Sequence, residues 1–135
     1  AQEVTDAVAA ARHGHRVRRL GWVDDRTRAD LLAGAEVVAY PSVYEGFGLP
    51  PLEALAAGTP VVATRAGALP EVLGDAAEWA DPGDAGSVAD ALRTLLQDPA
   101  RGEAIVAAGR RRLAAYSWDR TAAGLVELYR RAAAG

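Results

Sequence analysis

The amino-acid sequence predicts an α/β fold in which a parallel β-sheet is covered by α-helices. Two short apolar runs rich in β-branched residues, at 36–40 and 60–64, have the composition of strands that are buried on both faces. Helix-forming segments separate these runs, and alternation of strands with helices is typical of a parallel sheet. The chain has 135 residues, of which 50% are hydrophobic, which is enough for one domain with a single core.

The first third of the chain is predicted to contain a helix, a strand and a second helix. Residues 3–12 have a helix-forming composition, and the run Arg16–Leu20 is predicted to be a strand. The segment Asp25–Ala33 is predicted to be a helix whose acidic first turn suits the positive end of the helix dipole. The strand at 36–40 follows and ends before Pro41.

The segment Leu49–Ala57 is predicted to be the next helix. Pro50 and Pro51 fit its first turn, because the backbone N–H there has no partner inside the helix. Gly58 provides a C-terminal stop. A short loop therefore leaves the carboxyl end of a strand and enters the amino terminus of a helix.

The second half of the chain is predicted to be mostly helical. The strand at 60–64 precedes a short helix at Pro70–Leu73, and residues 76–80 are predicted to form a short strand or an extended segment. Three longer helices complete the chain, at Ser87–Gln97, Pro99–Tyr116 and Trp118–Ala133.

Four side chains are expected to cap these last helices or to pack them onto the domain. Ser87 and Ser117 are expected to be N-caps, because a serine hydroxyl can accept a hydrogen bond from a free N–H of the first turn. Trp118 and Tyr129 lie on the last helix and are expected to pack it onto the domain.

The composition argues against several classes of function. The sequence has no cysteine, which excludes a disulfide, a thiol nucleophile and a cysteine-ligated zinc, and it offers no convincing cluster of metal ligands. No apolar run reaches the length of a membrane span, and no signal-peptide pattern opens the chain. The net charge of −3 gives no reason to expect nucleic-acid binding. A cytoplasmic globular domain is the resulting expectation.

The loop before Leu49 is the most informative segment. Open α/β sheets bind ligands where a loop joins the carboxyl end of a strand to a helix amino terminus. Free N–H groups and the helix dipole favour an anion there. Gly46 and Gly48 lack the Cβ atoms that keep a phosphate away from the backbone. The loop can therefore hold a diphosphate.

Two carboxylates, Glu45 and Glu53, stand eight positions apart around this loop. A carboxylate can accept two hydrogen bonds from vicinal hydroxyls, whereas it repels a diphosphate, so the pair suits the hydroxyls of ribose and hexose. Together with the loop, the pair has what the binding of a nucleotide-sugar requires. The spacing alone is equally compatible with two solvated glutamates on a strand–turn–helix unit.

The segment resembles a known family signature. The run Glu45-Gly46-Phe47-Gly48-Leu49-Pro50-Pro51-Leu52-Glu53 is similar to the E-x7-E motif of retaining, GT-B-fold glycosyltransferases of family 4 (group 1). Further segments are similar in the same order, at 20–23, 57–64, 67–72, 81–84 and 116–118. The resemblance implies a Rossmann-like parallel sheet flanked by helices, the C-terminal half of a GT-B fold, truncated at its N-terminus. It also implies that the last helix crosses to the partner domain, so that exposure of part of its apolar face is the alternative to packing on this domain.

The resemblance also implies roles for the matching residues. Glu53 would bind the ribose hydroxyls of the donor nucleotide. Glu45 would contact the transferred sugar in the catalytic site, without acting as a nucleophile. The backbone would meet the sugar and diphosphate at Gly46, Phe47, Gly48 and Leu49.

Two further contacts with the donor are expected. Gly21, Trp22 and Val23 form a turn after the predicted strand Arg16–Leu20, and by resemblance this turn would lie against the base. Arg65 follows the strand at 60–64, at the edge of the sheet where a ligand binds, and is either a phosphate contact or a solvated loop arginine.

The function implied is transfer of a hexose from a UDP- or GDP-linked donor to an unknown acceptor, with retention of anomeric configuration and without a cofactor or metal. The family's donor domain begins with a stretch that carries a basic pair for the diphosphate, and this stretch is missing here. Residues 1–135 are therefore expected to be a partial donor-binding domain, without the N-terminal acceptor domain. Because stabilisation of a leaving diphosphate needs those cations, the fragment alone is expected not to transfer sugar.

Two alternatives stay open. One is a nucleotide-binding regulatory or interaction module without transfer activity, and the other is a related GT-B epimerase or phosphorylase. Peripheral attachment to the inner membrane face through the missing domain is the alternative to a purely cytoplasmic location.

Overall fold

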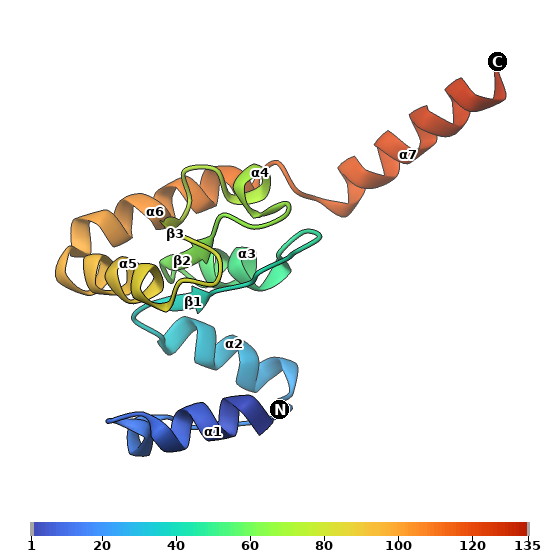
Figure 1. Ribbon diagram of the computed structural model, residues 1–135. Coiled ribbons are helices and arrows are strands. Elements are labelled where there is room, and N and C mark those ends of the chain that lie inside the picture. Colours follow the sequence, from blue (N-terminus) through green and yellow to red (C-terminus); the bar gives the residue numbers. More distant parts are fainter. Residues whose placement is uncertain (1, 135) are drawn as a thin grey trace.

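The computed structural model describes residues 2–134 and contains a parallel sheet surrounded by helices (Figure 1). Within this range the sheet has three strands in the order β1-β2-β3, namely β1 (Val38–Tyr40), β2 (Val61–Thr64) and β3 (Glu78–Ala80). Both pairs are parallel, with Val38 opposite Val61 and Val62 opposite Glu78. The predicted α/β fold with a parallel sheet is confirmed.

The helices follow the predicted order. They are α1 (Gln2–Ala10), the 3-10 helix η1 (Gly14–Arg16), α2 (Asp25–Gly34), α3 (Leu49–Ala56), α4 (Leu69–Leu73), α5 (Ala85–Gln97), α6 (Pro99–Leu113) and α7 (Trp118–Ala133). Helices α3 and α5 contact the strands directly, and α6 packs across α3, α4 and α5.

The core lies between the sheet and these helices. Every residue of β2 is buried, as expected for a central strand, and Leu55, Leu69 and Ile105 pack beside it. Burial of each such side chain stabilises the fold by roughly 1.5–3 kcal/mol. Close packing of α6 on α3 depends on Gly109, because a Cβ there would lie 2.7 Å from Cδ2 of Leu55.

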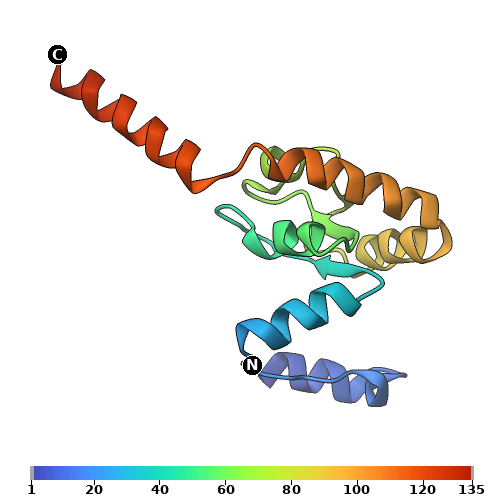
Figure 2. The same cartoon turned by 180° about the vertical axis from the view of Figure 1, so that it is seen from behind.

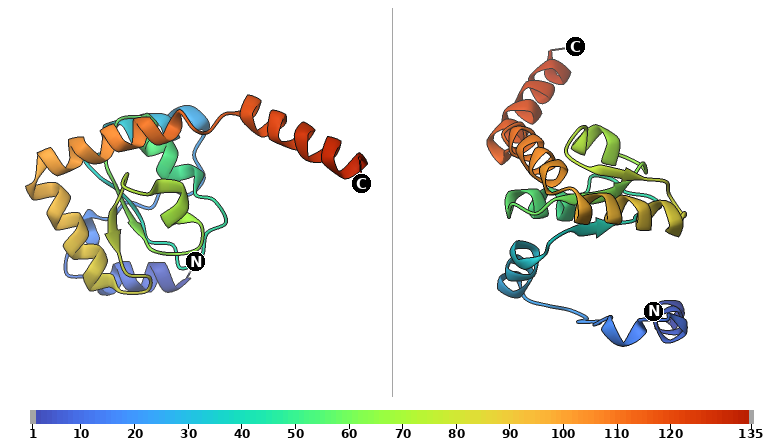
Figure 3. Two further views of the ribbon diagram at one scale, coloured as in Figure 1. Left: turned by 90° about the horizontal axis from the view of Figure 1, so that it is seen from above. Right: turned by 90° about the vertical axis from the view of Figure 1, so that its left-hand side faces the viewer.

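The predicted strand Arg16–Leu20 is wrong. Residues 14–16 form η1, and residues 17–20 have no regular structure. A strand needs a hydrogen-bonded neighbour, and this segment lies beside α1 and α2, away from the sheet (Figure 3). Val17 and Leu20 are half exposed as a result.

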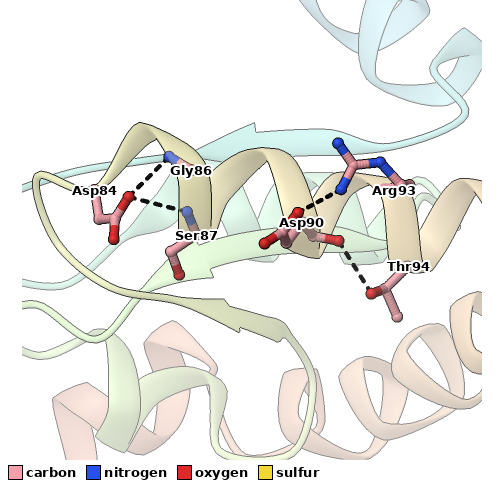
Figure 4. Close-up of polar contacts among 6 residues, drawn as sticks. All are labelled: Asp84, Gly86, Ser87, Asp90, Arg93 and Thr94. Atoms are coloured by element: carbon pink, nitrogen blue, oxygen red, sulfur yellow. Dashed lines mark hydrogen bonds and ion pairs between the residues drawn. The ribbon is translucent and has the colours of Figure 1, made fainter.

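Ser87 is not the N-cap of α5. The helix begins two residues earlier, where Oδ1 of Asp84 accepts hydrogen bonds from the N–H groups of Gly86 at 2.8 Å and Ser87 at 3.1 Å (Figure 4). The Ser87 hydroxyl instead accepts a hydrogen bond from the N–H of Asp81 at 2.9 Å. The Ser117 cap of α7 is confirmed, because its Oγ accepts from the N–H of Arg120 at 3.2 Å.

Trp118 and Tyr129 do not pack α7 onto the domain, and the alternative implied by the family resemblance, exposure of part of its apolar face, is what the structure has. The helix projects away from the sheet and from α3–α6 in both views (Figures 1 and 2). Trp118 is 87% exposed and Tyr129 is 66% exposed. The amphipathic pattern of the helix identifies an apolar face, but it carries no information on what that face contacts.

Candidate functional site

The loop of residues 41–48 joins the carboxyl end of β1 to the amino terminus of α3. Two contacts tie it to the segment that follows β2. The Thr64 hydroxyl donates to the carbonyl oxygen of Ser42, and the N–H of Ala68 donates to the carbonyl oxygen of Glu45 at 2.9 Å. The carboxyl ends of β1 and β2 therefore form one edge, as the sequence predicted for a ligand site.

The close approach between the segment after β2 and the loop of residues 41–48 depends on Gly67. Its φ is +53°, and a Cβ there would lie 2.1 Å from the carbonyl oxygen of Glu45. Gly48 has a φ of +96° and immediately precedes α3, and a Cβ there would lie 2.5 Å from Cδ2 of Leu69. Glycine at these two positions thus permits both the loop conformation and its contact with α4.

Glu45 is held by three hydrogen-bond donors. The Tyr40 hydroxyl donates to Oε2, and the N–H groups of Gly46 and Phe47 donate to Oε1 at 3.1 and 3.3 Å. The Tyr40 hydrogen bond, followed by that of Phe47, lowers the pKa of the Glu45 carboxyl, and the same bond raises the pKa of Tyr40. Glu45 is therefore ionised and oriented.

This arrangement has a consequence for anion binding. The N–H groups of Gly46 and Phe47, which the sequence assigned to the sugar and diphosphate, here face the carboxylate of Glu45. Leu49, the first residue of α3, is 60% exposed, and Phe47 is partly exposed with its ring nearly perpendicular to that of Tyr116. Gly48 is buried, and its backbone N–H is also directed at the Glu45 carboxylate, so the exposed backbone nearest the α3 amino terminus lies at Leu49.

Glu53 lies one turn inside α3, between the buried residues Leu52 and Ala54. Its Oε1 pairs with the guanidinium of Arg28 on α2 at 3.4 Å. Its Oε2 is buried and has no hydrogen-bond partner among residues 2–134. A buried carboxylate oxygen without a partner is unfavourable, and a ligand hydroxyl would satisfy it.

Arg65 and the predicted base contact have neighbours other than the two glutamates. Arg65 is exposed and its guanidinium lies over the ring of Trp79, 5.0 Å from the centroid. Gly21, with a φ of +70°, and Trp22, which is 89% exposed, lie in the irregular segment before α2. Within residues 2–134, no hydrogen bond, ion pair or ring contact links the turn of residues 21–23 to Glu45 or Glu53.

The sequence reasoning did not identify Tyr40, Arg28 or Trp79. Tyr40 ends the strand that leads into the loop, so an aromatic side chain with a polar tip at that position was an available signal. Arg28 lies 25 residues before Glu53 on another helix, and only the packing of α2 on α3 brings them together.

Other polar clusters and cavities lie elsewhere. A cavity of about 580 Å³ near the amino ends of β1 and β2 is lined by Glu36, Pro60 and Leu96, among others, and a shallower one of about 480 Å³ lies along α5. In the second, the Asp90 carboxylate faces Arg93 of the same helix (Figure 4). Within the described part of the chain, no three or more His, Cys, Asp or Glu residues could hold a metal ion, and no helix is long and apolar enough to cross a membrane.

Comparison with known proteins finds one matching family model and several related proteins. Residues 1–98 match the family model described as glycosyl transferases group 1. The chain is 46% identical over 116 residues to an MMP alpha-(1->4)-mannosyltransferase of Mycolicibacterium hassiacum, and this match covers 83% of the chain but 28% of that relative. The chain thus spans less than a third of that relative's length.

Solved structures agree with the predicted fold. Sucrose-phosphate synthase from Thermosynechococcus elongatus superposes with a TM-score of 0.86 and 33% identity, over 98% of this chain and 34% of the other. Anabaena Alr3699/HepE, solved in complex with UDP and glucose, superposes with a TM-score of 0.74 and 27% identity, over 82% of this chain and 30% of the other. The match lies in the C-terminal part of GT-B structures.

Proposed function

Because this chain belongs to the group 1 glycosyltransferase family, we propose that it is the donor-binding part of a longer, retaining hexosyltransferase. The donor is a nucleoside-diphosphate sugar, UDP- or GDP-linked. The observation that carries the proposal is how the fold holds the carboxylates of Glu45 and Glu53. Glu45 is held ionised beside the loop, and Glu53 presents a buried oxygen that no protein group satisfies within residues 2–134.

Each glutamate takes a different part of the donor. Oε2 of Glu53 accepts a hydrogen bond from a ribose hydroxyl, which gives this buried oxygen a partner. Glu45 accepts a hydrogen bond from a hydroxyl of the transferred sugar with the lone pair of Oε2 that its present partners leave free. The diphosphate lies near the α3 amino terminus at Leu49, where the helix dipole favours an anion.

The proposed donor site needs positive charge to balance the diphosphate. Two carboxylates beside the loop repel a diphosphate, and a leaving diphosphate needs cations to stabilise its charge. Arg28 already pairs with Glu53, and Arg65 lies over Trp79. We therefore propose that a basic pair, as well as the acceptor-binding domain, is supplied by other parts of the longer protein. The 135-residue chain alone then binds donor weakly and does not transfer sugar.

Calorimetric titration with UDP, GDP and ADP tests the donor site. One nucleotide should bind the complete protein saturably, and Glu53→Ala should abolish or strongly weaken that binding. Glu103→Ala is the matched control, because Glu103 is an exposed glutamate on α6 and lines the cavity near the amino ends of β1 and β2. If no nucleotide binds the complete protein even at millimolar concentration, the donor-site proposal is wrong.

Product analysis separates transfer from the alternatives. Incubation of the complete protein with UDP-glucose or GDP-mannose should release the free nucleoside diphosphate, and a retained anomer should appear in any glycoside formed. Nucleotide binding without any turnover of these donors would support a regulatory module. An epimerised sugar nucleotide or a sugar phosphate as the product would support an epimerase or a phosphorylase.

A further inference from the structure

We propose that Tyr40 is a positioning residue for Glu45, which holds the Glu45 carboxylate in the orientation that receives the transferred sugar. The inference rests on the proposed function, because that function assigns Glu45 to the sugar. Tyr40 lies five residues before Glu45, outside the segment that joins the two glutamates.

The Tyr40 ring has a fixed place in the fold. Its backbone is in β1, opposite Ala63 of the buried strand β2. Its ring is partly buried and packs against the hydrophobic core. Because both the sheet and the core hold this residue, its hydroxyl has a defined position at the carboxyl end of β1.

The hydroxyl completes a set of donors around the carboxylate. Tyr40 binds Oε2, while the N–H groups of Gly46 and Phe47 bind Oε1. The N–H of Ala68 fixes the Glu45 backbone through its carbonyl oxygen at 2.9 Å. Tyr40 supplies the side-chain donor in this set, so without it the carboxylate keeps only backbone bonds and gains rotational freedom.

A neutral donor suits this role. An arginine or lysine in place of Tyr40 would neutralise the carboxylate and compete with the sugar for both oxygens. A phenol hydroxyl gives one hydrogen bond to Oε2 and leaves the second lone pair of that oxygen free, while Oε1 accepts from Gly46 and Phe47. The carboxylate therefore keeps its negative charge and its capacity to accept a hydrogen bond from a sugar hydroxyl.

A Tyr40→Phe variant of the complete protein tests the proposal, because it removes the hydroxyl and keeps the ring. Calorimetry compares UDP with UDP-glucose, and GDP with GDP-mannose. Affinity for the sugar nucleotide should fall roughly tenfold or more, while affinity for the matching nucleotide, which lacks the sugar, should be unchanged. Tyr44→Phe is the matched control, since Tyr44 is in the same loop and 81% exposed.

A second readout follows the ionisation of Glu45. The acid limb of the pH profile for donor turnover should move to higher pH in Tyr40→Phe. The reason is that loss of the hydroxyl removes the main cause of the lowered Glu45 pKa. Carbon-13 NMR titration of the Glu45 carboxyl should show the same upward change without any donor present, which tests the contact directly.

The outcomes distinguish this inference from the proposed function. Equal weakening of nucleotide and sugar-nucleotide binding by Tyr40→Phe would show a general structural role and overturn the inference. An unchanged affinity for the sugar nucleotide, or an unchanged Glu45 titration, would overturn it as well. If the wild-type protein binds none of the four probes, the proposed function itself fails and this inference fails with it.

Discussion

The guanidinium of Arg28 lies 3.4 Å from Oε1 of Glu53, so a side chain of α2 pairs with one from the middle of α3. This pair leaves Oε2 of Glu53 buried and without a partner among residues 2–134. An unpaired buried acceptor costs about 1–3 kcal/mol. The ion pair, whose side chains are 52% and 36% exposed, stabilises by less than about 1 kcal/mol. Without a ligand, Glu53 therefore lowers the stability of the fold.

Replacement of Glu53 by methionine should separate stability from binding. Glu53→Met removes the unpaired oxygen and keeps an unbranched, helix-forming side chain of similar length, so the free energy of unfolding should rise by about 0.5–1 kcal/mol. Nucleotide binding should be lost in the same variant. Urea denaturation and calorimetry measure the two effects, with Glu103→Met as the control that changes neither. A less stable Glu53→Met protein would contradict the prediction.

Gly67→Ala should disturb the loop that carries Glu45. The substitution forces alanine into a φ of +53° and places its Cβ 2.1 Å from the Glu45 carbonyl oxygen. We expect a loss of more than about 2 kcal/mol in the free energy of unfolding, together with weaker donor binding. Gly83→Ala is the control, because Gly83 has a φ of +76° but nothing within 4 Å of its added Cβ. Gly83→Ala should lower the free energy of unfolding by about 1 kcal/mol and leave donor binding unchanged.

Substitution by alanine at two helical glycines should change the stability of the protein in opposite directions. At Gly109 of α6 a Cβ would lie 2.7 Å from Cδ2 of Leu55, so Gly109→Ala should destabilise by about 1–3 kcal/mol through overpacking. At Gly124 of α7 nothing lies within 4 Å, so Gly124→Ala should stabilise by about 0.5–1 kcal/mol through helix propensity. Thermal unfolding of both variants measures the contrast, and a shift of both in the same direction would refute it.

Stability should depend on pH through Glu45 and Tyr40. The Tyr40 hydrogen bond is the main cause of the lowered Glu45 pKa in the folded protein. A lowered pKa adds stability above the unfolded value of about 4.3, and this stability is lost as the pH falls through the folded value. The difference in urea midpoint between wild type and Tyr40→Phe should therefore be larger at pH 6 than at pH 3. The Tyr44→Phe protein should follow the wild type at both values.

The residue pattern was sufficient for most elements of the fold. The buried strand β2, the start of α3 at Leu49 and the full extent of α7 were predicted, because hydrophobic patterning and Gly or Pro signals act within a few residues. The segment containing Glu45 and Glu53 was equally visible, since its residues are neighbours in the chain. The N-cap of α5 was predicted wrongly at Ser87, because Asp84, three residues earlier, is an equally good cap.

The sequence by itself determined the alternation of strands and helices, the loop before α3 and the identity of its two glutamates. Only the tertiary structure decided that residues 17–20 form no strand, that α7 leaves Trp118 exposed, and that Tyr40 and Arg28 hold Glu45 and Glu53. The physical reason is the range of the interactions involved. Helix caps and turns depend on adjacent residues, whereas strand pairing, helix docking and side-chain contacts between elements depend on which surfaces the folded chain brings together.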